Sequence, residues 1–466
     1  GKIVEYNITN NEGKLQKGEI LDPGYPEVRE HIVNVLKEIV TKYDIDGLLM
    51  DDYFYPSVDA DTKNTFDSGS QALYFTPNQN TIEDFNEDGS KLDDWRRGNV
   101  DKVIEALSNE MRAVKPWVRF GMGPFGIWSS GEKDVIYTKY GIEKPDGIIG
   151  ANYYGDRGCN TVEWIKNGWV DYVNPQLYWP SLSSSPKYSS GQDYETLCEW
   201  WSELANKYNR PLFTSNDVAE NSNGRFTPPA DITNQINVNR TDDKAKGTIF
   251  YNNTYWQNRN GANTYFDSND EGYFTYLPEN HFHHIALWPS ISHRRAPSAP
   301  DITNLSLDKN KHTLSWECTK ENYRFAIYCY DTILSQTQGC KPENLLGITY
   351  TTSFSTLQYT DCYEGKVWNV KIVDRYGNVY TGAKLEPGMK EENPTALPTI
   401  KTELLPIYNT SDGIRIELNK RSHVSIYNIK GQIIYKKTIN GIININDLPK
   451  GIYIVTIDKQ SHKIII

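Results

Sequence analysis

The chain has 466 residues, enough for about three domains, or for one α/β barrel of about 250 residues followed by smaller domains. Hydrophobic residues make up 38% of it and charged residues 23%, which excludes a disordered or fibrous chain. The net charge of −11 argues against nucleic acid as the main ligand, and no run approaches the roughly 20 apolar residues of a membrane-spanning helix. Aromatic residues reach 12%, which favours a sugar ligand without deciding it.

A pattern of helix followed by strand begins at Pro26. Apolar side chains recur at spacings of three and four up to Tyr43, which predicts an amphipathic helix, and the apolar run at 45–50 predicts a buried strand. The same order recurs four times, with strands expected at 118–122, 170–174, 211–214 and 247–251. Five such units predict parallel, adjacent strands with helices outside, an α/β fold of the (β/α)8-barrel type.

Two proline-rich stretches, 296–300 and 391–401, divide the rest of the chain. Between them, short alternating runs such as 367–373 predict a β-sandwich, and alternation continues in the tail. From Lys401 onward, ten Lys and Arg stand against five Asp and Glu, so the tail is a basic unit in an acidic chain. We therefore predict three domains: a barrel-type domain at 1–295, a β-sandwich at 296–390 and a C-terminal β-domain at 396–466.

The six cysteines contain no CxxC pair and no zinc spacing. Cys198 falls within a predicted helix, where we expect a small core residue. Four of the six lie in the predicted sandwich, where one or more disulfides would form in an oxidising compartment. The presence of a disulfide stays open at this stage.

Two adjacent aspartates, Asp51 and Asp52, follow the first predicted strand. An α/β barrel gathers its catalytic groups at the C-terminal ends of its strands, so this position favours chemistry. Neighbouring strand residues point to opposite faces, so we expect one aspartate in the active site and the other in a structural role. The alternative is that both pair with Arg96 and Arg97.

If the ligand is a sugar chain that is hydrolysed, the reaction generally needs two carboxyl groups, so a second strand would have to supply the partner of Asp51. The fourth predicted strand is followed by Asp217, with Glu220 beyond it, whereas the fifth is followed by Asn252 and Asn253. Asp217 is therefore the expected partner. Amide, tyrosine and tryptophan side chains contact sugars, although each could equally be a core or loop residue. The substrate-binding residues that we expect at the same ends of the strands are Tyr53, Tyr55, Arg96, Trp128, Asn174, Gln176, Tyr178 and Trp179.

The acidic segment 84–89 has the spacing of a calcium loop. Asp84, Asn86 and Asp88 place oxygen ligands at alternate positions and a glycine stands sixth, but the twelfth position is Trp95 instead of glutamate. Asp93 or Asp94 could take the place of that glutamate. The alternative is a solvated acidic turn, and no other cofactor is expected.

Several motifs, in this order along the chain, resemble the glycoside-hydrolase-like family 10. They are Leu21–Gly24 with Pro26–Arg29, Tyr43–Gly47 leading into Asp51–Pro56, Trp95–Val100, Lys115–Trp117, Gly123–Trp128 and Gly168–Trp179. The resemblance covers about residues 20–290. It implies a (β/α)8 barrel of bacterial, often envelope-associated proteins that hydrolyse glycan strands, with peptide-free peptidoglycan chains as a substrate class.

The same resemblance implies that Asp51 ranks above Asp52, because related barrels carry a single aspartate at the matching position. The family's first three strand–helix units precede the Leu21–Gly24 motif, and only about twenty residues precede it here. We therefore expect a barrel that lacks about three units. Five strands do not close an eight-stranded barrel, so the activity of this chain is an open question.

The two β-regions carry resemblances of their own. Segment 301–386 looks like the fibronectin type III-like sandwich that is often appended to such enzymes. The tail is very similar to the C-terminal sorting domain of type IX secretion substrates in Bacteroidetes, with a plain third sandwich as the alternative. The resemblance implies export by the type IX secretion machinery, so we expect a secreted or cell-surface protein that does not span a membrane.

Two functions are compatible with these observations. The first is a secreted glycoside hydrolase acting on bacterial cell-wall or related polysaccharide, with peptide-free peptidoglycan strands favoured. The alternative is a non-catalytic glycan-binding or surface-anchored protein that keeps an aromatic cleft without a complete acid–base pair. The linkage cleaved and the stereochemical outcome stay open.

Overall fold

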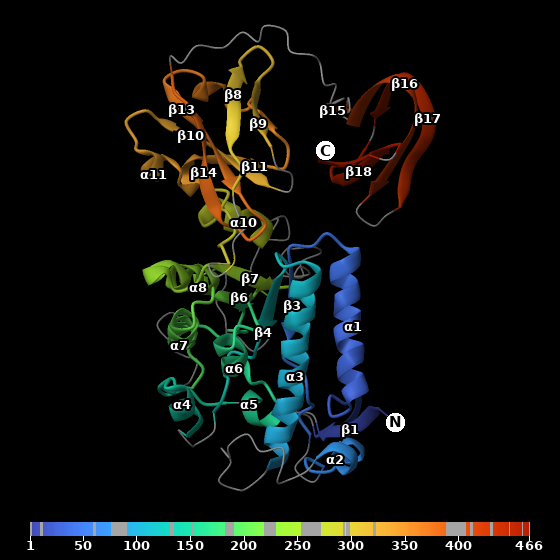
Figure 1. Ribbon diagram of the computed structural model, residues 1–466, viewed down its shortest axis with the longest axis vertical. Coiled ribbons are helices and arrows are strands. Elements are labelled where there is room, and N and C mark those ends of the chain that lie inside the picture. Colours follow the sequence, from blue (N-terminus) through green and yellow to red (C-terminus); the bar gives the residue numbers. More distant parts are fainter. Residues whose placement is uncertain are drawn as a thin grey trace. The chain divides into compact units, whose positions relative to one another are not determined.

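The computed structural model divides into two compact units, Gly1–Glu391 and Glu392–Ile466 (Figure 1). The predicted boundary near residue 296 falls inside the first unit, and the division into three domains stays a prediction. The structure describes residues 2–465 except for 10–12, 59–61, 76–90, 131–134, 151, 182–190, 219–229, 253–271, 292–293, 295–298, 320–322, 388–406, 411–412, 429–431, 447 and 459.

The first unit begins with an α/β part. Its elements are β1 (Ile3–Thr9), β2 (Leu15–Leu21), α1 (Pro26–Lys42), β3 (Gly47–Asp51), α2 (Ser68–Tyr74), α3 (Lys91–Val114), β4 (Arg119–Gly123), α4 (Val135–Tyr140), α5 (Tyr153–Asp156), α6 (Thr161–Lys166), β5 (Tyr172–Val173), α7 (Tyr194–Lys207), β6 (Phe213–Asp217), α8 (Ala230–Arg240), the 3-10 helix η1 (Thr241–Asp243), β7 (Gly247–Tyr251) and α10 (Tyr273–Asn280). The five predicted helix-then-strand units all appear among them.

The strands β3 to β7 are parallel and adjacent in chain order, as predicted. β3 pairs with β4, β4 with β5, and β6 with β7, all in parallel register. β5 and β6 are joined by the single parallel bridges Val173↔Leu212 and Gln176↔Ser215. Within the described ranges these strands form an open sheet, because β3 pairs with β4 and with no second strand. Closure into a barrel stays a prediction.

A β-hairpin that the sequence pattern did not reveal precedes these units. β1 and β2 pair antiparallel from Ile3↔Leu21 to Thr9↔Leu15, and their side chains are half-buried or exposed on both faces. Periodicity detects a strand by one buried face, so a hairpin without one escapes it. The hairpin leads into α1 through Asp22, whose Oδ1 accepts a hydrogen bond from the Gly24 nitrogen at 2.8 Å.

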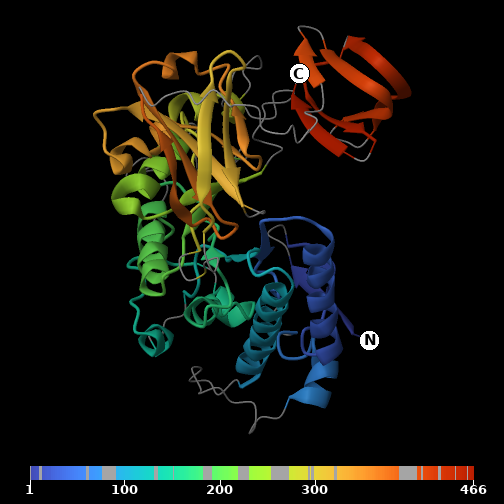
Figure 2. The ribbon, with the colours of Figure 1, turned by 45° about the horizontal axis from the view of Figure 1, so that its top comes forward.

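The helices α1 and α3 lie side by side along the sheet (Figure 1, Figure 2). Pro26 opens α1 at a position where a missing N–H costs no hydrogen bond, and the basic Lys42 lies in its last turn. The apolar sides of the two helices pack with Phe120 and Met122 of β4 into one buried core. Because this core lies on the helix side of the sheet, the apolar side chains at alternate positions of β3 and β4 point toward the helices, and the side chains between them point to the opposite face.

The rest of the first unit is antiparallel. Its elements are β8 (Ile302–Asp308), β9 (Thr313–Cys318), β10 (Arg324–Asp331), α11 (Gln336–Gly339), the 3-10 helix η3 (Pro342–Asn344), β11 (Leu345–Thr349), β12 (Ser353–Ser355), the 3-10 helix η4 (Thr360–Cys362), β13 (Lys366–Val373) and β14 (Val379–Leu385). One sheet has the strand order β12, β9, β8 and the other β11, β10, β13, β14. Trp316 and Trp368 share one buried core, and a disulfide joins Cys329 to Cys362, which answers the question that the cysteine spacing left open.

Contacts within the first unit join its antiparallel part to its α/β part. Arg375 lies 2.6 Å from Asp44, and Arg324 pairs with Asp46.

The second unit is a single antiparallel sheet. Its strands are β15 (Ile407–Thr410), β16 (Gly413–Asn428), β17 (Ile433–Asn446), β18 (Ile452–Ile457) and β19 (Gln460–Ile465). In neither unit does a described helix have the length and apolar character needed to cross a membrane.

Candidate active site

Asp51 is the last residue of β3 and points away from the helices. Leu48 and Met50 of the same strand pack against the core that α1 and α3 share, so alternation turns Leu49 and Asp51 to the opposite face. We call this the inner face of the sheet. Leu49 is 39% exposed there and Asp51 is exposed as well. Partial burial raises the pKa of the Asp51 carboxyl above its ordinary value.

Asp217 ends β6 on the same inner face. Thr214 and Asn216 of β6 face the helices, since Asn239 of α8 donates to the Thr214 hydroxyl at 2.7 Å and Asn216 donates to Gln235 at 2.6 Å. Alternation therefore turns Ser215 and Asp217 to the inner face. Asp51 and Asp217 thus stand at the C-terminal ends of two parallel strands, on one side of the sheet.

Tyr178 lies within electrostatic range of both carboxylates. Burial raises the pKa of its hydroxyl to about 12, a hydrogen bond with Ser215 opposes this, and the negative charges of Asp217 and Asp51 raise the pKa further. The oxygen atoms of Tyr178 and Ser215 are 3.2 Å apart, and the Tyr178 ring centroid lies 5.6 Å from that of Tyr251. Of the residues predicted for the site, Asp51, Asp217 and Tyr178 therefore come together.

Asp52 occupies a different environment from Asp51. Its side chain is fully buried, and its Oδ2 accepts a hydrogen bond from the backbone nitrogen of Phe125. Burial raises the pKa of Asp52 to about 7, against that hydrogen bond, which lowers it. The two adjacent carboxyl groups thus separate into one that faces solvent and one that ties neighbouring segments together.

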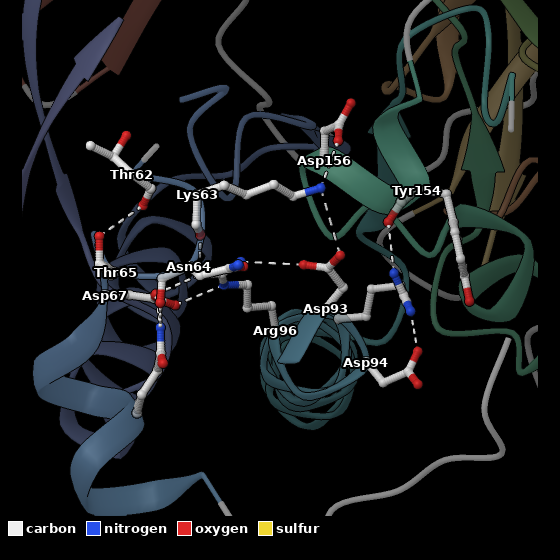
Figure 3. Close-up of polar contacts among 12 residues, drawn as sticks. Thr62, Lys63, Asn64, Thr65, Asp67, Asp93, Asp94, Arg96, Tyr154 and Asp156 are labelled. Carbon is white, nitrogen blue, oxygen red and sulfur yellow. Dashed lines mark hydrogen bonds and ion pairs between the residues drawn. The ribbon is translucent and has the colours of Figure 1, made fainter. Parts of the chain in front are cut away.

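Arg96 and Arg97 do not pair with Asp51 or Asp52, so the alternative interpretation of the two aspartates is wrong. Arg96 donates to Asp67 at 2.6 and 2.8 Å and to Asp93 at 3.2 Å, and Arg97 pairs with Asp94 (Figure 3). Arg96 was also expected to bind substrate. Its side chain is 6% exposed and committed to these partners, which leaves it in a structural network.

Three aromatic residues predicted to bind substrate are core residues in the structure. Tyr55 is 1% exposed, Trp128 2% and Trp179 5%. The Trp128 indole donates to the Cys159 carbonyl at 2.9 Å, and Trp179 packs edge-on against Phe125 at 5.4 Å. The structure does not bring these three side chains to the inner face beside Asp51. Tyr53, by contrast, is 57% exposed; partial burial raises the pKa of its hydroxyl, and the charges of the nearby Asp52 and Asp51 raise it further.

Asn174 and Gln176 hold neighbouring strands together. Asn174 donates to the Phe213 carbonyl at 3.0 Å, and Gln176 donates to the Gly123 carbonyl at 3.1 Å. β5 has only two residues, so its regular ladder is short. The two amide side chains supply hydrogen bonds between strands where this ladder has ended.

The predicted calcium loop lies outside the described residues, as do Glu220 and Asn253. Asp93 and Asp94, the suggested additional ligands, pair with arginines instead. In the described part of the chain, no group of three or more His, Cys, Asp and Glu side chains could hold a metal ion.

A cluster that the sequence did not reveal lies beside the two aspartates. The Arg157 guanidinium carbon lies 5.7 Å from the ring centroid of Tyr53 and 5.3 Å from that of Tyr153. Tyr153 in turn stacks on Phe125 at 4.2 Å, with the ring planes 5° apart. The signal was the aromatic and charged run of residues 152–157, which follows no predicted strand and was therefore passed over.

A pocket of about 330 Å³ opens beside Asp51 and Tyr53. Its remaining walls are apolar and come from the end of the hairpin, the β3 end, α1 and α3. The residues that complete the lining are Ile20, Leu21, Pro23, Ile32, Met50, Phe54, Val100 and Val103. Because Met50 and the residues from α1 and α3 lie on the helix side of β3, this pocket reaches Asp51 from the side opposite to the inner face.

Comparison with known protein families assigns both ends of the chain. Residues 7–216 match the family glycosyl hydrolase-like 10, and residues 410–466 match the secretion system C-terminal sorting domain. The chain therefore carries a glycosyl hydrolase-like 10 domain and a C-terminal sorting domain, which confirms these two of the three predicted resemblances. The sorting domain directs the protein to secretion or to the cell surface.

Two curated relatives are named glycosyl hydrolases. YngK of Bacillus subtilis (strain 168) is 31% identical over 322 residues, which cover 66% of this chain and 56% of that protein. DigH of Escherichia coli (strain K12) is 28% identical over 247 residues, which cover 51% of this chain and 49% of that protein. The chain thus spans about half the length of the curated relatives it matches.

Among solved structures, the PgaB (BpsB) glycoside hydrolase domain from Bordetella bronchiseptica overlaps 57% of this chain and 69% of its own, with 12% identity and a TM-score of 0.33. The catalytic domain of β-amylase from Paenibacillus polymyxa overlaps 60% of this chain and 74% of its own, with 11% identity and a TM-score of 0.37. Likenesses this low support no argument about the site.

Proposed function

We propose that this protein is a secreted or surface-displayed glycoside hydrolase that cleaves bacterial cell-wall polysaccharide, with peptide-free peptidoglycan strands as the favoured substrate. The observation that carries the proposal is the position of Asp51 and Asp217 at the C-terminal ends of β3 and β6, both on the inner face, with Tyr178 in range of both. The glycosyl hydrolase-like 10 domain and the names of the relatives support it.

The chemistry divides between the two carboxyl groups. Glycoside hydrolysis needs one group that protonates the leaving oxygen and another that attacks the sugar or activates water. Burial raises the pKa of Asp51, which favours the protonated form that the acid step requires. Asp217 is then the nucleophile or base. Tyr178, whose pKa is raised to about 12, keeps its proton at neutral pH and can donate a hydrogen bond to a sugar oxygen.

Asp52 serves the site indirectly in this proposal. Its Oδ2 holds the backbone nitrogen of Phe125, and its own carbonyl oxygen accepts a hydrogen bond from the Cys159 thiol at 3.0 Å. These bonds connect the end of β3 to the segments that carry Phe125 and Arg157. Asp52 is therefore a positioning residue beside the carboxylate that contacts substrate.

The test compares single variants of the full-length gene product on peptide-free glycan strands, with released reducing sugar as the readout. Asp51→Asn and Asp217→Asn should each lower kcat by at least about 100-fold, the usual contribution of an acid or base. Asp156→Asn is the matched control, because Asp156 lies on α5 and forms an exposed ion pair with Lys63 at 3.5 Å. This control should keep full activity.

The outcomes separate the possible mechanisms. Loss in Asp51→Asn with full activity in Asp217→Asn would assign the second carboxyl group to another residue. Full activity in both variants would contradict the mechanism. Glycan binding by the unmodified protein without any release of sugar would favour the second candidate, a non-catalytic glycan-binding protein. The observation behind that candidate is that the described parallel strands number five and leave the sheet open.

Two finer assignments belong to the same proposal. The strand orders β12, β9, β8 and β11, β10, β13, β14 support a fibronectin type III-like sandwich at 296–390. A structural calcium ion held by Asp84, Asn86 and Asp88 stays a prediction from sequence spacing alone.

A further inference from the structure

Arg157 presents a positive charge near Asp52 and Tyr53, and none of the acidic residues that the structure describes pairs with it. Its guanidinium lies over the rings of Tyr53 and Tyr153, and its Nη1 donates to the Tyr55 carbonyl oxygen at 3.2 Å. Throughout the described ranges, no carboxylate oxygen lies within 4.0 Å of this guanidinium. Asp156, its neighbour in sequence, turns to Lys63 instead (Figure 3).

Two other arginines of this unit also lie over aromatic rings, and each of them pairs with a carboxylate. Arg97 lies 4.1 Å from the Tyr154 ring centroid and pairs with Asp94. Arg96 lies 4.5 Å from the Phe66 ring centroid and binds Asp67 with two hydrogen bonds. In both, an aromatic ring covers one face of the guanidinium while its edge takes a carboxylate. Arg157 has the rings but not the carboxylate.

The position of Arg157 puts this charge in the candidate site. Its guanidinium carbon lies 5.7 Å from the Tyr53 ring centroid, and its positive charge opposes the rise in pKa that burial causes in Asp52 and Tyr53. Tyr53 is 57% exposed, and it also lies near Asp51 and Tyr251. Arg157 itself is half-buried. A ligand that contacts Asp51 and the exposed Tyr53 ring would therefore have the Arg157 guanidinium nearby.

We propose that Arg157, with Tyr53 and Tyr153, forms a subsite for a free carboxylate carried by a sugar of the substrate. This inference rests on the proposed function and names a residue that would determine its specificity. A guanidinium binds a carboxylate with two parallel hydrogen bonds, and a tyrosine ring offers a flat face to a pyranose. The carboxylate can come from a uronic acid or from the acid side chain that removal of peptides exposes on peptidoglycan.

Binding is the primary test, and it uses the full-length gene product with three probes. They are peptide-free glycan strands, the same strands with their carboxylates reduced to alcohols, and a uronic acid oligosaccharide. The unmodified protein should bind the native strands at least tenfold more tightly than the reduced strands. Tight binding of the uronic acid oligosaccharide instead would name that source of the carboxylate. Equal binding of native and reduced strands would overturn the proposal without any variant.

Variants then assign the effect to Arg157. Arg157→Gln should lower affinity for the native strands at least tenfold and leave affinity for the reduced strands unchanged, and Arg157→Lys should fall between. Arg240→Gln is the matched control, since Arg240 has one bond to a carbonyl oxygen, that of His281, and one ring contact, with Phe282 at 5.6 Å. Unchanged preference for native strands in Arg157→Gln would overturn the proposal.

The inference and the proposed function can fail separately. Binding that depends on the carboxylate, without release of sugar, would retain the subsite and refute the hydrolase. Release of sugar at equal kcat and KM from native and reduced strands would retain the hydrolase and refute the subsite. A rise of KM with unchanged kcat in Arg157→Gln would show that the residue holds the ground state and the transition state equally.

Discussion

The carboxylate of Asp52 accepts a hydrogen bond from the backbone nitrogen of Phe125, and this bond ties the end of β3 to the segment after β4. The other carboxylate oxygen of Asp52 is buried without a hydrogen-bond partner among the described residues. A buried, half-satisfied carboxyl group favours its neutral form, so the pKa of Asp52 rises to about 7. Its protonation state therefore changes near neutral pH, next to the proposed catalytic group.

We expect Asp52→Asn to weaken the pH dependence of stability. The pKa of Asp52 rises from 3.8 to about 7 on folding, so the folded protein keeps a proton that the unfolded chain releases in this window. The stability that Asp52 contributes through this proton is on the order of 4 kcal/mol. It is fully present below about pH 4 and is lost as the pH rises to about 7. Asparagine keeps an acceptor for Phe125 and does not titrate. The measurement is the free energy of unfolding in urea at pH 4.5 and at pH 8. If the unmodified protein and Asp52→Asn lost the same unfolding free energy between these two pH values, the prediction would be contradicted.

Burial also raises the pKa of Asp101, to about 6, but here we expect the substitution Asp101→Asn to lower stability through its hydrogen bonds. Both of its oxygens are used, since Asn160 donates to one at 2.9 Å and the Trp164 indole to the other at 2.6 Å. An asparagine would set an NH₂ group against one of these donors, so we expect a loss of about 1–3 kcal/mol at pH 8. Urea unfolding measures it. Glu105→Gln, an exposed change on the same helix, is the control, and an equal effect of both would refute the argument.

The ion pair between Asp67 and Arg96 should be among the costliest to break. Their side chains are 0% and 6% exposed, and Asp67→Asn removes the carboxylate that takes two of the hydrogen bonds of the buried Arg96 guanidinium, which leaves it with Asp93 at 3.2 Å. We expect a loss of about 3–5 kcal/mol in the free energy of unfolding. Asp156→Asn removes the exposed pair with Lys63 and should cost about 1 kcal/mol or less. Similar losses for the two variants would show that the network tolerates the uncompensated charge.

Deletion of residues 396–466 should abolish export and leave the rest of the protein folded. The tail belongs to a separate compact unit with its own buried core, and it carries the sorting domain. The melting temperature of the truncated protein should match that of the intact chain to within a few degrees, while the surface and medium fractions lose the protein. A truncated protein that no longer folds in soluble form would mean that the tail stabilises the first unit.

The strand order was predictable from the sequence because each strand follows an amphipathic helix and is apolar itself. The exception in detail is β6, expected at 211–214 and found at Phe213–Asp217. Its second half is polar, and Asn216 is satisfied by Gln235 of α8 and by the Tyr194 hydroxyl of α7. Hydrophobic periodicity does not register a buried layer built from hydrogen bonds.

The site was predictable in part, for a related reason. Asp51 could be inferred because it directly follows an apolar strand. Residue type alone, however, does not separate a core aromatic such as Trp128 from one that contacts a ligand. Arg157 owes its place to contacts across the fold, including a hydrogen bond to Tyr55, 102 residues away in sequence. Only the folded chain shows that these residues meet.

Arg294 forms hydrogen bonds with both parts of the first unit. Its guanidinium binds Asp171 of the α/β part, and its carbonyl oxygen accepts a hydrogen bond from Asn378 of the antiparallel part at 2.8 Å. Loosening either part therefore removes support from the other. Residues 1–391 should melt in one cooperative step, and reduction of the Cys329–Cys362 disulfide should lower the temperature at which the parallel sheet is lost as well.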